Sequence, residues 1–337
     1  MEYRSLGSSG LKVSTVGLGT WLTFGSGLNQ DQANATVLRA IELGINLFDT
    51  ANEYSGGQAE EALGKALSAV PRSSYVVATK VYWPMGDGPN EWGLSRKHIT
   101  EQAEASLRRL GTDYLDLYQC HRFDPQRPLA ETCRAMNDLI NAGKILYWGV
   151  SEWTAEQIRD TVLLCRDAGW AAPISNQPMY NPLWRAIERR ILPVSDVLGL
   201  GTLAFSPLAM GVLTGKYTSA TDLPQDSRGA GWAYAFFTEE DNWQDMPFFT
   251  QATLDAVGRL KPLAESLDAS LAQLALAWCL HQPGVTSVLT GSSRLSQLED
   301  NAAAADLQIP PETLDQITTT LADVATLDAP PIPNMES

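Results

Sequence analysis

The chain has 337 residues, of which 44% are hydrophobic and 19% charged, a composition typical of soluble globular proteins. Its 24 Lys and Arg against 39 Asp and Glu leave a formal charge of −15, which excludes nucleic acid and anionic membranes as favoured partners. No window approaches the roughly 18 apolar residues of a membrane span, and the start lacks the apolar core of a signal peptide. We therefore expect a cytoplasmic protein with no membrane and no nucleic acid among its partners.

Eight short apolar or β-branched runs alternate along the chain with stretches of helical period. The strand candidates span 14–21, 45–50, 75–80, 114–121, 145–151, 171–177, 201–208 and 286–293. The helical stretch 99–111 ends at Gly111, a typical stop, and Ser95, Ser151 and Thr154 are expected to act as N-caps. The alternation predicts an α/β fold, a (β/α)8 TIM barrel that takes in residues 1–337 as a single domain. A doubly wound sheet is the alternative, but no G-x-G-x-x-G follows a strand.

Four segments depart from a minimal barrel. Residues 1–15 have the pattern of an N-terminal β-hairpin that caps the barrel floor, and a tail is expected at about 325–337. Long loops follow strand 3 (81–94) and strand 7 (about 209–250), on the side where barrels build their active sites, so they are candidate covers for substrate or cofactor. The second loop carries many aromatic residues that could instead pack together or on a neighbouring subunit: Tyr217, Trp232, Tyr234, Phe236, Phe237 and Trp243.

The cysteines and histidines show no ligand-like spacing. The four cysteines form no CxxC motif, so buried free thiols are expected, and Cys120 is expected to point away from its neighbour His121. The three histidines are too scattered for a metal site, and we expect none.

Four residues with complementary chemistry lie at or just after three strand ends: Asp49, Tyr54, Lys80 and His121. A tyrosine ionises near pH ~10, and a neighbouring lysine ammonium would lower that pKa. An aspartate would hold the lysine charged, and a neutral histidine could donate a hydrogen bond to a substrate carbonyl. Singly, each residue has an ordinary structural explanation, such as a turn or surface position. Together they predict a site that protonates an oxygen.

Several motifs resemble the aldo-keto reductase family, and within it the branch of the voltage-gated potassium channel β subunits and related bacterial reductases. They are FDTANEYSGGQAEEALGKAL, the ATK of strand 3, SLRRLGTDYLDLYQCHR and AFSPLAMGVLTGKY. The resemblance implies that Tyr54 is the proton donor, tuned by Asp49 and Lys80, while His121 orients the carbonyl. It also implies that channel subunits usually lack a histidine at the position of His121, which favours a working reductase.

The resemblance further implies NADPH, bound without a Rossmann fingerprint. The matching cofactor-binding positions are Thr20, Trp21, Asp49, Ser151, Gln177, Phe205, Ser206, Pro207, Leu208, Gly211, Lys216, Arg228, Gly291, Ser293, Arg294, Gln297 and Asn301. A Gly-Ser-Ser turn that opens a helix suits phosphate, and Arg294 with Lys216 could neutralise a 2′-phosphate. Glu152 departs from the asparagine of many members, and a carboxylate cannot donate to a carboxamide oxygen.

These observations predict NADPH-dependent reduction of small aldehydes or ketones, with Trp21, Tyr54, Trp83 and His121 lining the substrate pocket. A redox-sensing nicotinamide-binding regulatory subunit is the alternative, and an aldolase using Lys80 as a Schiff base is a third possibility. The branch forms dimers to octamers, so a homo-oligomer is a possible assembly.

Overall fold

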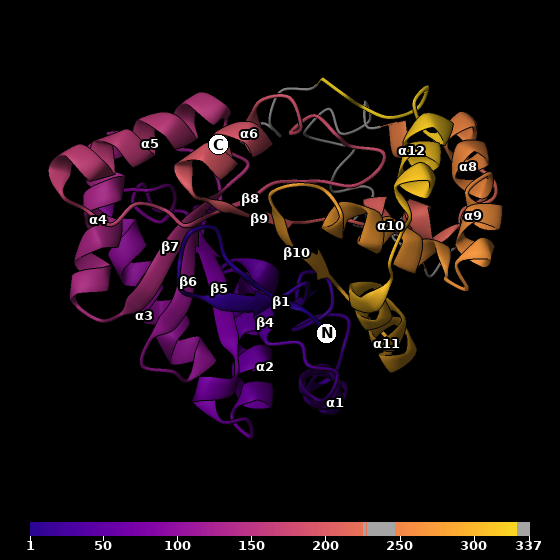
Figure 1. Ribbon diagram of the computed structural model, residues 1–337. Coiled ribbons are helices and arrows are strands. Elements are labelled where there is room, and N and C mark those ends of the chain that lie inside the picture. Colours follow the sequence, from indigo (N-terminus) through magenta and orange to yellow (C-terminus); the bar gives the residue numbers. More distant parts are fainter. Residues whose placement is uncertain (225–226, 228–246, 329–337) are drawn as a thin grey trace.

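The computed structural model describes residues 1–224, 227 and 247–328. Within them, eight parallel strands close into a barrel in the order β10-β3-β4-β5-β6-β7-β8-β9 (Figure 1). The barrel strands are β3 (Val16–Gly19), β4 (Leu47–Asp49), β5 (Val76–Val81), β6 (Leu115–Cys120), β7 (Ile145–Ser151), β8 (Ser175–Gln177), β9 (Gly201–Ala204) and β10 (Val285–Thr290). The predicted (β/α)8 TIM barrel is confirmed, with its long loops after the third and seventh barrel strands, β5 and β9.

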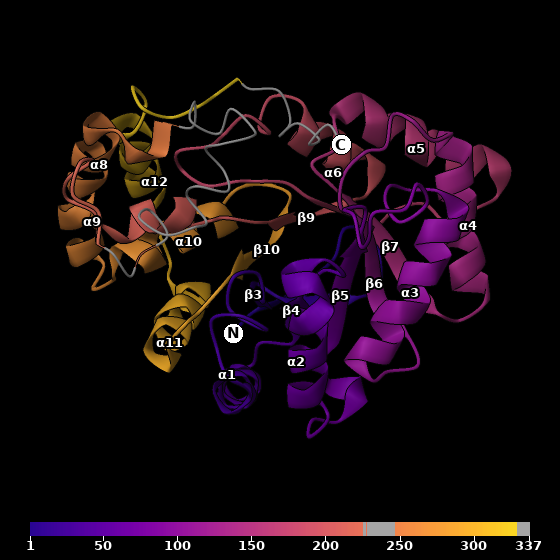
Figure 2. The same ribbon diagram turned by 180° about the vertical axis from the view of Figure 1, so that it is seen from behind.

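Helices surround this barrel, as the two opposite views in Figures 1 and 2 show. They are α1 (Gln30–Glu42), α2 (Gln58–Leu67), α3 (Arg96–Leu110), α4 (Leu129–Asn141), α5 (Ala155–Ala168), α6 (Ile191–Leu198), α8 (Gln251–Gly258), α9 (Lys261–Ser266), α10 (Leu271–Leu280), α11 (Leu295–Ala303) and α12 (Pro311–Thr320). Successive helices from α1 to α6 contact one another, and α11 contacts α1, so the ring closes where the chain's two halves meet.

An N-terminal hairpin, β1 (Tyr3–Ser5) with β2 (Lys12–Ser14), packs against the barrel at β10. Its Leu6 and Val13 are fully buried among inward-facing residues of the barrel strands. The turn residue Gly7 has a positive φ of 59°, and a Cβ there would lie 2.2 Å from the carbonyl oxygen of Gly199. Hairpin and barrel therefore meet backbone to backbone, and the predicted floor cap is confirmed.

Helix caps follow the sequence in two of three places. Ser95 accepts a hydrogen bond from the backbone of His98, and Thr154 forms a capping box with Gln157. The prediction for Ser151 is wrong, because this residue ends β7 and its hydroxyl donates to the carbonyl oxygen of Gln177 at 2.7 Å. At the end of a strand its side chain points into the barrel rather than toward the next helix.

Strand alternation divides the side chains into two sets. On β5, Val76 and Ala78 face the barrel interior, whereas Val77 and Val81 face the helices. The lower interior is apolar and consists of Leu6, Val13, Leu47, Val76, Ala78, Leu117, Leu203 and Leu289. The next inward residues toward the strand ends are polar, so each strand carries chemistry to the mouth above an apolar floor.

Part of the loop predicted to cover the substrate or cofactor, about 209–250, lies within the described residues. Short 3-10 turns stand at η3 (Ala209–Thr214) and η5 (Pro247–Phe249), and Tyr217 is buried with its ring 5.3 Å from that of Phe249. The other five aromatic residues singled out in the sequence lie outside the described residues: Trp232, Tyr234, Phe236, Phe237 and Trp243. Of the predicted tail, Thr326 pairs with Trp184, and residues 329–337 lie outside the described part.

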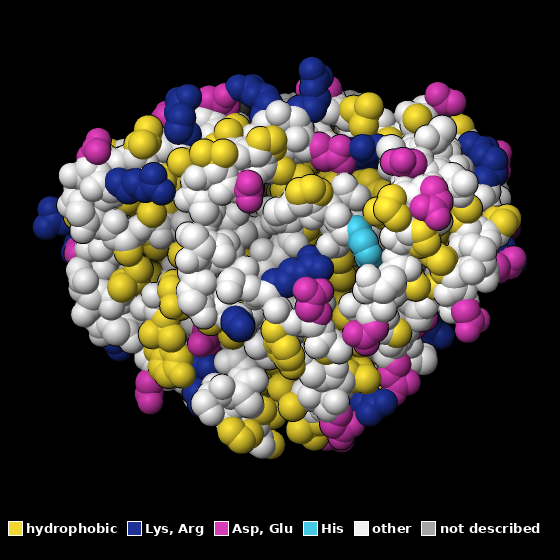
Figure 3. Space-filling view, viewed as in Figure 1, with side chains coloured by type: hydrophobic (Ala, Val, Ile, Leu, Met, Phe, Trp, Pro, Cys, Tyr) yellow, Lys and Arg dark blue, Asp and Glu magenta, His cyan; other side chains and the backbone are white. Residues whose placement is uncertain are grey.

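No helix among the described residues is long and apolar enough to cross a membrane. On the face shown in Figure 3, Lys and Arg side chains are interspersed with Asp and Glu rather than gathered into one basic patch. This face therefore offers no continuous positive surface for a nucleic acid backbone.

A buried ion pair joins α2, β5 and α3 behind the polar layer. Glu60 is fully buried; it accepts a hydrogen bond from Arg109 Nε at 2.6 Å and another from Thr79 Oγ1 at 2.5 Å. Burial raises the pKa of Glu60, and Arg109 opposes that rise. The Arg109 side chain also packs against Gly57, directly before α2, so the pair links Lys80's strand to the turn that carries Tyr54.

We predict that Arg109→Met lowers the free energy of unfolding by about 3 kcal/mol or more at neutral pH, because it leaves the Glu60 carboxylate buried without a cation. Without Arg109 the pKa of Glu60 rises further, so the folded state binds this proton more tightly than the unfolded state. The loss should therefore shrink between about pH 8 and about pH 5. Urea unfolding at both pH values measures it.

The matched control is Arg96→Met, which removes an exposed pair with Asp138 and should cost less than about 1 kcal/mol. Equal losses in the two variants would contradict a special role for the buried pair.

Candidate active site

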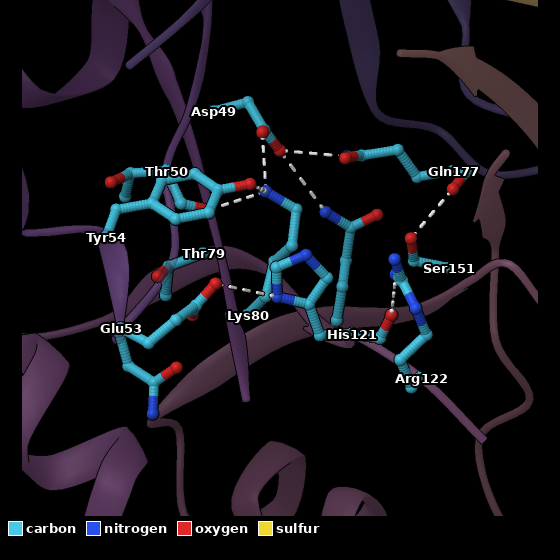
Figure 4. Close-up of polar contacts among 12 residues, drawn as sticks. Asp49, Thr50, Glu53, Tyr54, Thr79, Lys80, His121, Arg122, Ser151 and Gln177 are labelled. Carbon is cyan, nitrogen blue, oxygen red and sulfur yellow. Dashed lines mark hydrogen bonds and ion pairs between the residues drawn. The ribbon is translucent and has the colours of Figure 1, made fainter. Parts of the chain in front are cut away.

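Three of the four predicted residues meet directly at the barrel mouth (Figure 4). Lys80 Nζ donates to Asp49 Oδ1 at 2.6 Å, to the carbonyl oxygen of Thr50 at 2.7 Å and to Tyr54 Oη at 3.2 Å. His121 lies beside them, with its ring centroid 5.9 Å from that of Tyr54. The sequence prediction that these side chains converge therefore agrees with the geometry.

Strand register explains the convergence. Asp49 is paired with Ala78 across β4 and β5, and Lys80 is paired with Gln119 across β5 and β6. Asp49 and Lys80 thus face inward from neighbouring strands, each one layer above the apolar floor. Tyr54 arrives from η1 (Tyr54–Gly57), a 3-10 turn whose Ser55 has a positive φ of 51°. This tight turn brings the phenol back over the strand ends.

Asp49 also accepts hydrogen bonds from two side-chain amides. Its second oxygen, Oδ2, accepts from Gln177 Nε2 at 2.9 Å and from Gln119 Nε2 at 3.4 Å. Gln119 was not among the residues predicted from the sequence. Counting back two residues from His121 along an alternating strand would have placed it on the same inner face.

The pKa of Tyr54 is raised well above its usual value, first by burial of the hydroxyl and then by the charges of Asp49 and Glu53. The expectation that Lys80 lowers this pKa is therefore wrong for the site as a whole. Burial and the two carboxylates outweigh the effect of the ammonium, part of whose charge is compensated by Asp49 at 2.6 Å. At neutral pH Tyr54 holds its proton.

His121 stands between charges of both signs. Its Nδ1 lies 3.3 Å from Glu53 Oε1, and Arg122 Nη1 donates to its backbone carbonyl oxygen at 2.7 Å. Burial lowers the pKa of His121, Lys80 and Arg122 lower it further, and Glu53 raises it. Glu53 and Arg122 were not predicted as site residues, although each directly adjoins a predicted one.

Aromatic side chains border the site as predicted. The ring of Trp21 lies 6.4 Å from that of Tyr54, and the ring of Trp83 lies 6.1 Å from that of His121. The Arg122 guanidinium lies over Trp83, 5.3 Å from the ring centroid. The four predicted substrate-pocket residues therefore occupy one region of the mouth.

Several predicted cofactor positions adjoin Asp49. Gln177 contacts it directly, Ser151 contacts Gln177, and the backbone amide of Thr20 donates to the Asp49 carbonyl at 2.9 Å. Thr20 Oγ1 and Gln119 Oε1 are buried and have no partner among the described residues. Such polar atoms are costly to bury unless a ligand or water satisfies them.

The segment after β9 has an unusual backbone. Phe205 is half-buried and pairs with Met179, and Ser206, Ala209, Met210 and Gly211 all have positive φ angles. Pro207 is buried and Leu208 half-buried in the same turn. The side chain of Lys216 folds back over Gly211, where a Cβ would lie 2.9 Å from Nζ. Arg228, also predicted to contact the cofactor, lies outside the described residues.

The predicted adenosine end gathers at the start of α11. Ser293 donates from its backbone amide and its hydroxyl to Gln297 Oε1, both at 3.0 Å, and Asn301 Nδ2 donates to Ser292 Oγ at 3.5 Å. Gly291 and Arg294 are exposed, and Arg294 precedes α11 without a side-chain cap. The helix start thus presents amides toward solvent.

Glu152 accepts a hydrogen bond from the backbone rather than facing the predicted cofactor position as a donor. Glu152 has a positive φ of 57°, a conformation that asparagine adopts more readily, and its carboxylate accepts from the backbone of Met179.

All four cysteines are described, buried and free of disulfides, and burial raises the pKa of Cys120. In the described part of the chain, no three His, Cys, Asp or Glu are grouped so as to hold a metal ion.

Fold and site together define a (β/α)8 barrel protein with a tyrosine, a lysine, an aspartate and a histidine at its mouth. Residues 15–322 match the model of the aldo/keto reductase family, and the chain belongs to that family. It is 43% identical over 322 residues to an Arabidopsis thaliana protein named "Probable voltage-gated potassium channel subunit beta", covering 94% of this chain and 95% of that protein. A protein of the same name from Oryza sativa subsp. japonica shows the same identity and coverage.

The buried pair can be tested without any substrate. We predict that Lys80→Met destabilises the fold by about 3–5 kcal/mol, because Asp49 is left buried without its cation. The double variant Asp49→Asn/Lys80→Met should recover a large part of this loss, since no charge remains. A double-mutant cycle in urea gives the coupling energy, and strictly additive losses would contradict the direct pairing.

Proposed function

We propose that the chain reduces small aldehydes or ketones to alcohols with NADPH, using Tyr54 as the proton donor. The contact between Lys80 Nζ and Tyr54 Oη carries this proposal. Because the ammonium donates in this contact, the phenol oxygen acts as the acceptor and its own proton stays free for a substrate oxygen. The raised pKa of Tyr54 keeps that proton in place until a substrate arrives.

Two observations support an anionic dinucleotide as cofactor. Lys216 and Arg294 have no carboxylate partner among the described residues, although the chain carries a net charge of −15. Thr20 and Gln119 present unpaired buried polar atoms beside Asp49. We propose that Ser151, Gln177 and Thr20 hold the nicotinamide end, Phe205 stacks on the ring, and residues 206–216 and 291–301 hold the phosphates and adenosine. When bound, the cofactor supplies the hydride.

The protein's own residues perform the proton chemistry. Tyr54 passes its proton from Oη to the substrate oxygen as negative charge develops there. Lys80, already donating to Oη, then stabilises the phenolate, and Asp49 holds Lys80 in position. Trp21 and Trp83 exclude water from the substrate, which strengthens each of these interactions.

An aldolase that uses Lys80 as a Schiff base is less well supported. A nucleophilic lysine must lose a proton, but all three protons of Lys80 are engaged at 2.6, 2.7 and 3.2 Å. Borohydride trapping of a carbonyl on Lys80 would be required to favour that activity.

A regulatory role is the second candidate, and the names of the relatives favour it. In that role, cofactor occupancy would be read by a membrane channel, and catalysis would be secondary. Stoichiometric recovery of a membrane partner together with negligible turnover would support it. A cytoplasmic location and a homo-oligomer remain predictions under either function.

Catalysis is tested by following NADPH oxidation with 4-nitrobenzaldehyde or methylglyoxal. We expect turnover by the wild type and a loss of about 100-fold or more in kcat for Tyr54→Phe, with NADPH binding retained. Tyr75→Phe is the control, since Tyr75 packs on Phe48 outside the site and should keep full activity. A wild type that binds NADPH but turns over no carbonyl, or an active Tyr54→Phe, would refute the proposal.

Cofactor choice depends on Arg294. We expect Arg294→Ala to weaken NADPH binding by about tenfold, roughly 1.4 kcal/mol, while NADH binding changes little, because only NADPH carries a 2′-phosphate. Quenching of tryptophan fluorescence measures both affinities. The control Arg134→Ala removes an exposed arginine from α4, away from this end, and should alter neither. Equal weakening for both cofactors would assign Arg294 elsewhere.

A further inference from the structure

Glu53 has no part in the reaction proposed above, yet it faces the site. It directly precedes Tyr54, its side chain is 19% exposed, and its Oε1 lies 3.3 Å from His121 Nδ1. Its second oxygen and His121 Nδ1 are both buried without a hydrogen-bond partner among the described residues, so the 3.3 Å approach of Glu53 Oε1 is the polar contact that Nδ1 has there. Figure 4 shows the carboxylate against one edge of the imidazole ring, with the opposite edge turned away from it.

Charged groups on every neighbouring element act on this ring. Lys80 from β5 and Arg122, which follows His121, are the cations, and Tyr54 shares the loop of Glu53. Behind the cations stand Asp49, bound to Lys80, and Glu152, which acts on Arg122. Burial, Lys80 and Arg122 lower the pKa of His121, and Glu53 is the group that raises it. Glu53 is therefore the acidic neighbour that favours the protonated form of the His121 ring.

A carboxylate beside one ring nitrogen decides where a histidine carries its proton. An ionised carboxylate accepts hydrogen bonds but has no proton to give, so the nitrogen facing it bears the hydrogen. In a neutral ring the other nitrogen, Nε2, is then bare and can only accept. Only the doubly protonated ring can donate from Nε2 to a carbonyl oxygen.

We propose that Glu53 is a positioning residue that holds neutral His121 in the Nδ1–H tautomer. His121 then orients a carbonyl only when it is protonated, and it orients an alcohol, by accepting its hydroxyl proton, when it is neutral. The tautomer is inferred from the geometry alone, whereas its effect on the rate of carbonyl reduction rests on the proposed reductase function. It replaces the sequence-based expectation that a neutral His121 donates to the substrate.

Long-range proton–nitrogen NMR on protein labelled with ¹⁵N-histidine reads the tautomer directly. The chain has three histidines, so the His121 signals are assigned by their loss in His121→Gln. Above the titration of His121 we expect the Nδ1–H form in the wild type. We expect Glu53→Met, which removes the acceptor at similar size, to shift the ring toward the Nε2–H form and lower the pH at which it titrates.

The matched control is Glu152→Gln, which removes one nearby negative charge but keeps an acceptor for the Met179 amide. Its His121 tautomer should be that of the wild type. A wild-type ring in the Nε2–H form overturns the inference without any variant, and so does a Glu53→Met ring that keeps the Nδ1–H form.

The kinetic measurement is separate from the spectroscopic one. We expect carbonyl reduction by the wild type to fall about tenfold per pH unit above the titration of His121 seen by NMR, since one proton is lost. In Glu53→Met this fall should be largely lost, because the neutral ring in the Nε2–H form can still donate to the carbonyl. The expected tautomer in a protein with no turnover would reject the proposed reductase, and active enzyme with the Nε2–H form would reject the role of Glu53.

Discussion

The structure depends on how a buried ammonium is satisfied. The Lys80 side chain is completely shielded from solvent, so each of its three protons needs an acceptor within the protein. Asp49, the Thr50 carbonyl and Tyr54 supply them, and these three come from one strand end and the turn beyond it. The same requirement therefore aligns β4 with β5 and brings the phenol over the mouth. The contacts that satisfy the buried ammonium are therefore the contacts that assemble the site.

The fold could be predicted well from the sequence because its signals are local. Each strand is a short apolar run, and helix stops such as Gly111 and caps such as Thr154 are decided by neighbouring residues. Ser151 was misassigned because serine suits both a cap and a strand end, and only the strand's length separates these roles. Boundaries that depend on tertiary contacts are less readable than those set by local chemistry.

The candidate site was predictable where a residue's position on a strand fixes its direction. Asp49, Lys80 and His121 are of this kind, and Tyr54 follows from its short distance along the chain. Glu53 and Arg122 were not predicted, because a charged residue beside a strand end is most often solvated. The charged groups that act on Arg122 lie elsewhere in the chain, among them Glu152 and Glu53. The sign of the Tyr54 pKa shift was missed for another reason: the lysine's charge was counted, but the burial of the phenol was not.

The family is named for reductases, whereas the relatives of this chain are named as channel subunits. A family defined by reductases includes proteins named as channel subunits, so the scaffold alone does not determine which role a member performs. We propose that individual side chains at the mouth, His121 above all, decide between the two roles in this chain.

The hairpin floor has an electrical consequence as well as a mechanical one. Leu6, Val13 and the aliphatic residues of the lower barrel form a poorly polarisable base directly beneath the Lys80–Asp49 pair. Field lines from that dipole are not screened from below, so they extend upward into the mouth. A reacting oxygen placed there would feel an oriented field before any contact forms. The hydrocarbon beneath the site is thus part of its electrostatics.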